Sequence, residues 1–255
     1  MEHESELKSL LTEQEFENSE DRDFLLAQAK NCAKAYARAT EGIAVVSDFQ
    51  NNECHIYSGK FGQNVMKLPE YMADRNSAFE NIVFGQAKED ELIERHILEL
   101  RFFSFLKDLP VEEKTNFAAS CTLSFYKVGS KQKVRMLHTT RYLSCSDNGS
   151  ILFSLCTYAP HPASRNNGQY SVIINLSTGE AVEPERVEAS DHKLLSPRQT
   201  EILSLIAKGV PSKQIADRLS ISVFTVNRHR QDILATLKVA NTAAAVEIAL
   251  RMNLI

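Results

Sequence analysis

Tryptophan is absent from the sequence, and cysteine is scarce and scattered. The cysteines number five, and none stands in a CxxC pair, which excludes the ligand spacing of a zinc finger and the paired framework of a small secreted protein. We expect buried free thiols in a reducing cytoplasm. The cysteines are Cys32, Cys54, Cys121, Cys145 and Cys156.

Long apolar runs are missing as well. No run approaches the roughly 18 residues that a membrane-spanning helix needs, so no membrane partner is expected. The first residues, MEHESELKSLL, are acidic and lack the basic-then-apolar layout of a signal peptide. With 255 residues, of which 43% are apolar and 24% charged, the chain fits a globular protein of one large or two ordinary domains in the cytoplasm.

Lys and Arg residues (29) are fewer than Asp and Glu residues (33), and they are unevenly distributed along the chain. The net charge is −4 for the whole chain. Residues 191–255 nevertheless carry nine Lys or Arg against five Asp or Glu, a net charge of +4, which leaves −8 for residues 1–190. This division indicates a small module for a polyanion, attached to an acidic body.

The N-terminal pattern mixes helix and strand signals. Residues 86–109 predict a long helix before Pro110, and residues 42–49 and 53–59 predict two short strands on either side of a turn. Between them, 61–85 predict irregular structure or short helices. An earlier helix is predicted for residues 20–39, with a buried stripe formed by Phe24, Leu25, Ala29, Cys32, Ala33 and Tyr36.

Residues 118–176 change to the alternating pattern of strands. Three antiparallel strands are predicted at 118–128, 133–145 and 150–159, separated by the turn signals Gly129-Ser130 and Asp147-Asn148-Gly149. A fourth is predicted at 169–176. The polar stretch that follows reads as a linker. We therefore predict an α+β domain at 1–180, a linker at 181–193 and an all-α domain at 194–255.

The C-terminal segment returns to helical periodicity in four short bursts. Ser196 and Pro197 predict the start of the first helix and Gly209 its end. The second and third helices are joined by the short turn Ser220-Ile221-Ser222, and the fourth is capped by Asn241 or Thr242. A short helix, a tight turn and then a longer, basic helix predict a helix-turn-helix.

The third helix divides its residues between two faces. Val226, Ile233 and Leu237 form an apolar stripe, and the opposite side carries Phe224, Asn227, Arg228, Gln231 and Ala235. A helix that enters the major groove needs such polar side chains, since Asn and Gln pair with adenine and Arg with guanine. Ser222 and Thr225 stand at the helix start, where free amides and the helix dipole favour phosphate.

In residues 195–255 the sequence resembles the LuxR/FixJ-type (GerE-like) helix-turn-helix domain. The resemblance is carried by many ordered matches: Leu195-Ser196-Pro197-Arg198, Glu201, Ala207, Gly209, Lys213, Ile215-Ala216, Leu219, Ile221-Ser222, Thr225-Val226, His229, Ile233-Leu234 and Leu237. It implies a transcriptional regulator that binds double-stranded DNA as a homodimer, with the fourth helix often at the dimer contact. Contact with RNA polymerase is left open.

Carried over by position, the resemblance implies base reading by Asn227, Arg228 and Gln231. It implies phosphate contacts by Lys213, Thr225, His229 and Arg230, to which the helix-start argument adds Ser222. Three positions depart from the family pattern. Pro211 stands where a Ser or Thr cap is usual, and Lys238 replaces a frequent Gly. Asn227 replaces a commoner Lys, which would either shift the preference toward adenine or weaken a phosphate contact.

The N-terminal domain resembles a PAS-like sensor in the order of its elements alone. It lacks the alternating βα pattern of a phosphorylatable receiver and the tryptophan of acyl-homoserine-lactone-binding domains. A controlling role, by sensing or by dimerisation, is what this resemblance implies. The sequence identifies no cofactor and does not specify the signal, the target promoter, or activation versus repression.

Two alternatives stay open at this stage. One is a sigma-factor-like polymerase subunit, which would require helices where 117–176 reads as strand. The other is an enzyme or ligand-binding protein tethered to DNA, which would require a polar pocket with a catalytic set in 1–180. We expect no enzyme, because Asp48 lacks the partner acids of a phospho-acceptor and Cys54 and His55 would point to opposite faces of a strand. His96 is expected to be a core histidine rather than a haem ligand, and no metal set accompanies His229.

Overall fold

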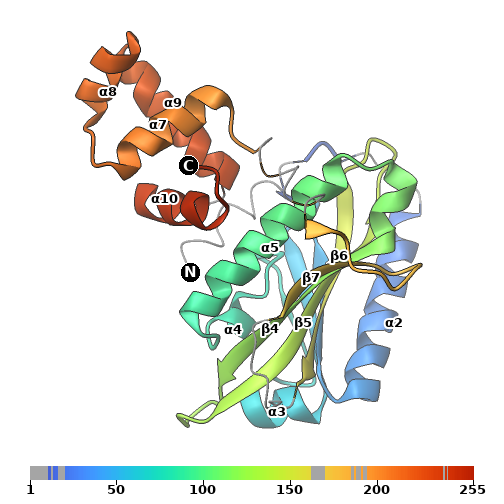
Figure 1. The fold of residues 1–255 in the computed structure, drawn as a ribbon. Coiled ribbons are helices and arrows are strands. Elements are labelled where there is room, and N and C mark those ends of the chain that lie inside the picture. Colours follow the sequence, from blue (N-terminus) through green and yellow to red (C-terminus); the bar gives the residue numbers. More distant parts are fainter. Residues whose placement is uncertain are drawn as a thin grey trace.

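The computed structural model describes residues 11–12, 14–16, 21–161, 170–184, 187, 191, 194–237, 239 and 241–255. Within these ranges the chain forms a sheet with helices on both faces, followed by a compact group of helices (Figure 1). The predicted α+β domain followed by an all-α domain is confirmed. The boundaries at 180 and 194 stay a prediction.

The N-terminal part builds one antiparallel sheet, which has seven strands among the described residues, in the order β3-β2-β1-β6-β5-β4-β7. The strands are β1 (Ile43–Asp48), β2 (Glu53–Ser58), β3 (Tyr71–Asp74), β4 (Phe117–Tyr126), β5 (Lys133–Cys145), β6 (Ile151–Pro160) and β7 (Ser171–Asn175). The helices are α2 (Arg22–Thr40), α3 (Lys60–Met66), α4 (Asn81–Phe84), α5 (Glu89–Lys107) and the 3-10 helix η1 (Val111–Asn116).

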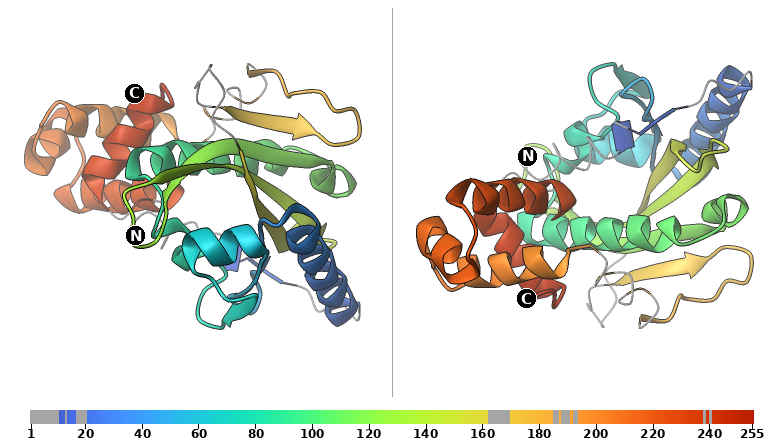
Figure 2. Two further views of the ribbon diagram at one scale, coloured as in Figure 1. Left: turned by 90° about the horizontal axis from the view of Figure 1, so that it is seen from below. Right: turned by 90° about the horizontal axis from the view of Figure 1, so that it is seen from above.

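Alternation along the strands divides the sheet into two packed faces. On β1, Ile43 and Val45 join the core beneath α5, whereas Ala44 and Val46 join the core beneath α2. Because successive side chains of a strand point to opposite sides, the two helices cover opposite faces. Figure 2 shows α2 and α5 on either side of the sheet.

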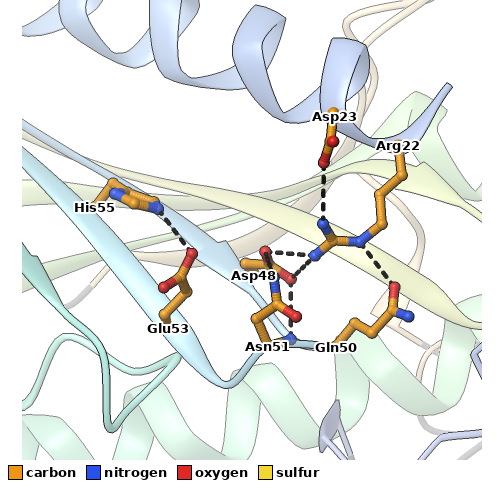
Figure 3. Close-up of polar contacts among 7 residues, drawn as sticks. All are labelled: Arg22, Asp23, Asp48, Gln50, Asn51, Glu53 and His55. Carbon is orange, nitrogen blue, oxygen red and sulfur yellow. Dashed lines mark hydrogen bonds and ion pairs between the residues drawn. The ribbon is translucent and has the colours of Figure 1, made fainter.

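The N-terminal end of α2 is fixed to the turn between β1 and β2 by a buried ion pair (Figure 3). Arg22 Nη2 lies 2.6 Å and 2.5 Å from the two carboxylate oxygens of Asp48, a residue with 0% exposure. Asn51 donates its backbone N–H and its side-chain amide to the same carboxylate. Arg22 Nε also donates to Gln50 at 2.8 Å. Asp48 therefore serves to hold two elements together.

Two details of the predicted helices and strands were wrong. The buried side of α2 is Leu26, Ala29, Ala33 and Ala37, while Phe24 is 62% exposed and Cys32 is exposed. The small alanines let α2 lie close against the sheet, and periodicity alone did not separate this face from its neighbour. Strand β3 was also missed, since it is short and pairs only at one edge of the sheet.

Helix α5 belongs to two hydrophobic cores at once. Leu98 and Phe102 pack into the core of the sheet domain, and Ile93, Ile97 and Leu100 pack with the C-terminal helices. A single apolar stripe therefore does not describe this helix. In Figures 1 and 2, α5 lies between the sheet and the C-terminal helices.

The described residues of the stretch predicted to be a linker contact the N-terminal domain. Val182 donates to the backbone oxygen of Ile173, and Val187 is buried in the sheet-domain core. Asp191 is 2% exposed and accepts from Arg101 Nε of α5 at 2.8 Å. Residues 185–186, 188–190 and 192–193 of the predicted linker lie outside the described residues.

The C-terminal domain consists, in its described part, of α7 (Pro197–Ala207), α8 (Ser212–Leu219), α9 (Val223–Leu237) and α10 (Thr242–Arg251). The predicted start of α7 is confirmed, since Ser196 and Gln199 form a reciprocal capping box. Asn241 caps α10 by accepting from the backbone of Ala244 at 3.0 Å. Pro211 stands at the N-cap of α8 without a side-chain cap, as its departure from the family pattern suggested.

No single helix among the described residues is long and apolar enough to cross a membrane. Helices α9 and α10 reach that length and composition only together, with a bend of 58° between them.

Candidate DNA interface

Helix α9 begins at a hydroxyl pair. The backbone N–H of Thr225 donates to Ser222 Oγ at 3.0 Å, and the two hydroxyl oxygens lie 2.8 Å apart. Ser220, with φ of 53°, ends α8 in the left-handed conformation and turns the chain toward α9. The turn is held by the backbone N–H of Ile221, which donates to Ala216 at 3.0 Å. This leaves the capped start of α9 at the surface.

The polar side of α9 is open to solvent. Asn227, Arg228 and Gln231, the three predicted base readers, are all exposed. They share one side of the helix, since residues three and four apart lie one above the other. Asn and Gln offer both a donor and an acceptor, and the Arg guanidinium offers a fork of donors. The structure therefore brings these three together on one free surface.

The opposite side of α9 is clamped by the other helices of the domain. Val226, Ile233 and Leu237 are buried at 1% exposure or less and share a core with Ile202 of α7 and Ile215 of α8. This packing fixes the rotation of α9 about its axis. The direction in which the polar residues point is therefore set by the core.

The predicted phosphate-contacting residues differ in how free they are. Lys213 and Ser222 are exposed, while Thr225, His229 and Arg230 are half-buried. Arg230 donates from Nη1 to Ser212 at 2.9 Å and from Nη2 to Thr242 at 3.0 Å, and so bridges α8, α9 and α10. Two of its nitrogens are thus engaged within the domain, a role that the sequence interpretation did not assign.

Arg198 is a second positioning residue whose role the sequence interpretation missed. Its Nη2 donates to the carbonyl oxygen of Leu219 at 2.8 Å, at the end of α8, and its Nη1 pairs with Glu201 at 2.7 Å. The side chain thus ties α7 to the turn before α9. In the sequence, Arg198 is marked only as one of the matching positions, directly after Ser196-Pro197.

The C-terminal domain docks on α5 through polar contacts as well as the shared core. His96 Nε2 donates to the backbone oxygen of Leu237 at 3.3 Å, so this histidine faces the end of α9. Arg251 of α10 pairs with Glu94 of α5 and, at 2.8 Å, with Glu247 of its own helix. Ile97 and Leu100 fill the centre of the contact. Asn227, Arg228 and Gln231 of α9 lie outside this contact, since all three are exposed.

The opposite side of α5 carries a buried polar cluster. Arg95 pairs with Glu99 at 2.7 Å and donates from Nε to His138 of β5 at 3.4 Å. All three residues are buried. Burial opposes the charge on Arg95, yet Glu99 and Glu80 hold its pKa above the ordinary value. Tyr158 donates to Glu80 at 2.7 Å and stacks on His138.

His138 is held neutral within this cluster. Burial, and then the guanidinium of Arg95, keep the pKa of His138 well below its ordinary value of 6.5. Its Nε2 accepts from Arg95 Nε at 3.4 Å and lies 3.0 Å from the hydroxyl oxygen of Thr140. A change at this cluster would act on α5 directly, because Arg95 and Glu99 belong to that helix.

No group of three or more His, Cys, Asp or Glu that could hold a metal ion occurs among the residues that the structure describes. Cys54 and His55 do point to opposite faces of β2, since Cys54 is in the core beneath α5 and His55 contacts Tyr71 at 3.1 Å on the other side.

Comparison with known proteins singles out the same segment. Residues 193–249 match the model of "Bacterial regulatory proteins, luxR family". The oxygen regulatory protein NreC of Staphylococcus epidermidis is 38% identical over 84 residues, which are 32% of this chain and 38% of that protein. NreC of Staphylococcus aureus is 44% identical over 63 residues, 25% of this chain and 29% of that protein. The chain thus spans only 29% to 38% of the length of these curated relatives.

Solved structures give a weaker likeness over more of the chain. The phage VqmA–DPO complex covers 92% of each chain at 12% identity and a TM-score of 0.30. Escherichia coli SdiA covers 98% of each chain at 15% identity and a TM-score of 0.23. At these scores the domain arrangement in those structures says nothing about this chain. On the match of residues 193–249 and the helix-turn-helix built there, the C-terminal domain belongs to the luxR family of bacterial regulatory proteins.

Proposed function

We propose that the chain is a transcriptional regulator that binds double-stranded DNA through α9 and is controlled by its N-terminal domain. The observation that carries this proposal is the free polar side of α9, with Asn227, Arg228 and Gln231 exposed above a fully buried apolar stripe. A bacterial regulator of this kind would act in the cytoplasm, where the DNA is.

The contacts divide into base reading and positioning. Arg228 would read guanine and Asn227 and Gln231 adenine, since these pairs match in donors and acceptors in the major groove. Lys213, Ser222, Thr225 and His229 would bind phosphate around the start of α9. Arg230 and Arg198 would hold the helices at the correct angle, as their hydrogen bonds indicate.

Control by the N-terminal domain is supported by the position of α5. This helix is shared by both cores, with the Arg95–Glu99 pair on one side and Ile97 and Leu100 on the other. A shift of α5 on the sheet would therefore move the surface on which the DNA-binding domain rests. The order of strands, short helices, long helix and antiparallel strands supports a PAS-like domain, and strands β4 to β7 occupy the region where a sigma-factor-like subunit would need helices.

A homodimer would place two copies of α9 in successive major grooves. Half-sites would then be separated by one helical turn of DNA, about 34–36 Å from centre to centre. RNA polymerase is a further partner that such a dimer would engage at a promoter.

Selection of bound sites from random DNA tests the proposal. The full chain should enrich a two-fold symmetric sequence, and Arg228→Ala or Gln231→Ala should relax the preference at one position of each half-site by about 1–3 kcal/mol. Lys34→Ala, an exposed cation of α2, is the matched control and should leave the selected sequence unchanged. Enrichment of no sequence, or the same sequence with both variants, would overturn the assignment.

A further inference from the structure

One apolar residue lies among the polar side chains of α9. Phe224 is 77% exposed, which is the highest value for a large hydrophobic residue in the described part of the chain. Placing a phenyl ring in water is unfavourable, and exposed single apolar residues are common enough to need no explanation by themselves. The position of Phe224 on the helix is what distinguishes it.

Phe224 lies in the middle of the base-reading side. Successive residues of an α-helix are rotated by about 100°, so Phe224, Gln231 and Ala235 fall on one line along the helix. Asn227 and Arg228 flank that line on its two sides. Val226, Ile233 and Leu237, which are buried, lie on the opposite side. A surface that brings Arg228 and Gln231 to base edges therefore brings the phenyl ring there as well.

The place of Phe224 along α9 agrees with this orientation. It is the second residue of the helix, directly before Thr225, whose backbone N–H is bonded to Ser222. The N-terminal residues of a recognition helix are those that contact base edges most directly. The only apolar group on the major-groove edge of a base pair is the C5-methyl group of thymine, which an apolar side chain such as Phe contacts.

We propose that Phe224 reads thymine, by burying its ring against the C5-methyl group of one thymine in each half-site. This inference rests on the proposed DNA-binding function and adds a contact that depends on a methyl group to the hydrogen bonds of Asn227, Arg228 and Gln231. The alternative is that another protein, rather than DNA, covers the ring of Phe224. Phe224 stands among side chains suited to base edges, which favours DNA.

Deoxyuridine tests the contact because it differs from thymidine by that methyl group alone. Each thymine of the selected site is replaced in turn, and binding to the full-length protein is measured for Phe224→Ser, Phe224→Leu and the unchanged chain. The loss of one buried methyl group should weaken binding of the unchanged chain about fourfold at one thymine per half-site. Phe224→Leu keeps an apolar side chain and should keep most of this sensitivity.

Phe224→Ser should bind the thymine and deoxyuridine sites equally at that position, while it keeps the sensitivity of the unchanged chain at every other position. Its high exposure makes a folding defect easy to exclude by comparing melting temperatures. An equal response of the unchanged chain and Phe224→Ser at every thymine would overturn the inference and favour a protein partner for the ring. Absence of any selected sequence with the unchanged chain would instead overturn the proposed function, and the inference with it.

Discussion

Arg251, in the last turn of α10, pairs with Glu94, near the start of α5, and this contact joins the C-terminal domain to the helix that crosses the sheet domain. Both side chains are more than a third exposed. Such a pair contributes about 0–1 kcal/mol, so it orients the two domains more than it stabilises them. The apolar contacts of Ile97 and Leu100 beside it contribute the larger part.

Reversal of the charge at Glu94 should loosen this contact. Glu94→Arg places two cations together at the edge of the interface, and we expect faster amide hydrogen exchange in α10 while the sheet keeps its protection. The matched control is Glu113→Arg, which reverses an exposed acid of η1 and should leave α10 unchanged. Identical exchange in α10 for the two variants would show that the pair does not orient the domains.

Salt dependence of DNA binding should distinguish Lys213 from the proposed base readers Asn227, Arg228 and Gln231. Lys213 is exposed before α9 and is proposed to neutralise a phosphate. Lys213→Ala should weaken binding to all sequences alike and lower the slope of log K against log salt by about 1. Lys34→Ala removes the same charge from α2 and should leave the slope unchanged. A slope that Lys213→Ala does not alter would remove this residue from the interface.

Most of the C-terminal domain could be predicted because its signals are local. The capping box of Ser196, the cap at Asn241 and the apolar stripe of α9 each depend on residues a few positions apart. The roles of Arg198 and Arg230 could not be predicted in this way. Their partners lie on other helices, and sequence spacing does not show which carbonyl or hydroxyl a long side chain reaches.

The N-terminal domain was predicted in class and in most strands, but its packing was not. The double role of α5 depends on a second domain that docks on it, so a single apolar stripe could not describe it. The buried cluster of Arg95, Glu99 and His138 joins α5 to β5, far apart in the sequence. Sequence spacing does not show that the sheet lies beneath Arg95 and Glu99.

The Arg22–Asp48 pair should be important for stability. Asp48 is fully buried, so Arg22→Leu leaves a buried carboxylate whose remaining hydrogen-bond partner, among the residues that the structure describes, is Asn51. We expect a loss of about 3 kcal/mol in the free energy of unfolding. Asp48→Asn in the Arg22→Leu background removes the unpaired charge and should recover part of the loss. Urea denaturation measures both.

Asp23 supplies the matched control for this pair. It lies 3.7 Å from the same guanidinium but its side chain is 99% exposed, so Asp23→Asn should change the stability by less than about 0.5 kcal/mol. Similar losses for Asp23→Asn and Arg22→Leu would mean that Arg22 acts through its general charge at the start of α2. The pairing of Arg22 with Asp48 would then add little to the free energy of unfolding beyond that charge.

His138 should make the protein sensitive to acid. Its pKa in the folded protein is held well below 6.5 by burial and by Arg95, so the folded form keeps the imidazole neutral while the unfolded chain takes up a proton. The stability that this neutral form provides is complete above about pH 6.5 and falls as the pH drops below it, by up to about 1.4 kcal/mol per pH unit. The ring also faces Arg95, which pairs with Glu99, and Tyr158, which donates to Glu80.

His138→Gln tests this dependence, because the amide oxygen of Gln is able to accept from Arg95 and Thr140 in place of Nε2. Melting temperatures between pH 7.5 and pH 5 should fall less steeply for His138→Gln than for the unchanged chain. The exposed His161 provides the control, since His161→Gln should reproduce the unchanged profile. If His138→Gln also loses stability steeply below pH 6.5, the acid sensitivity arises elsewhere, and His138 is protonated in the folded protein without cost.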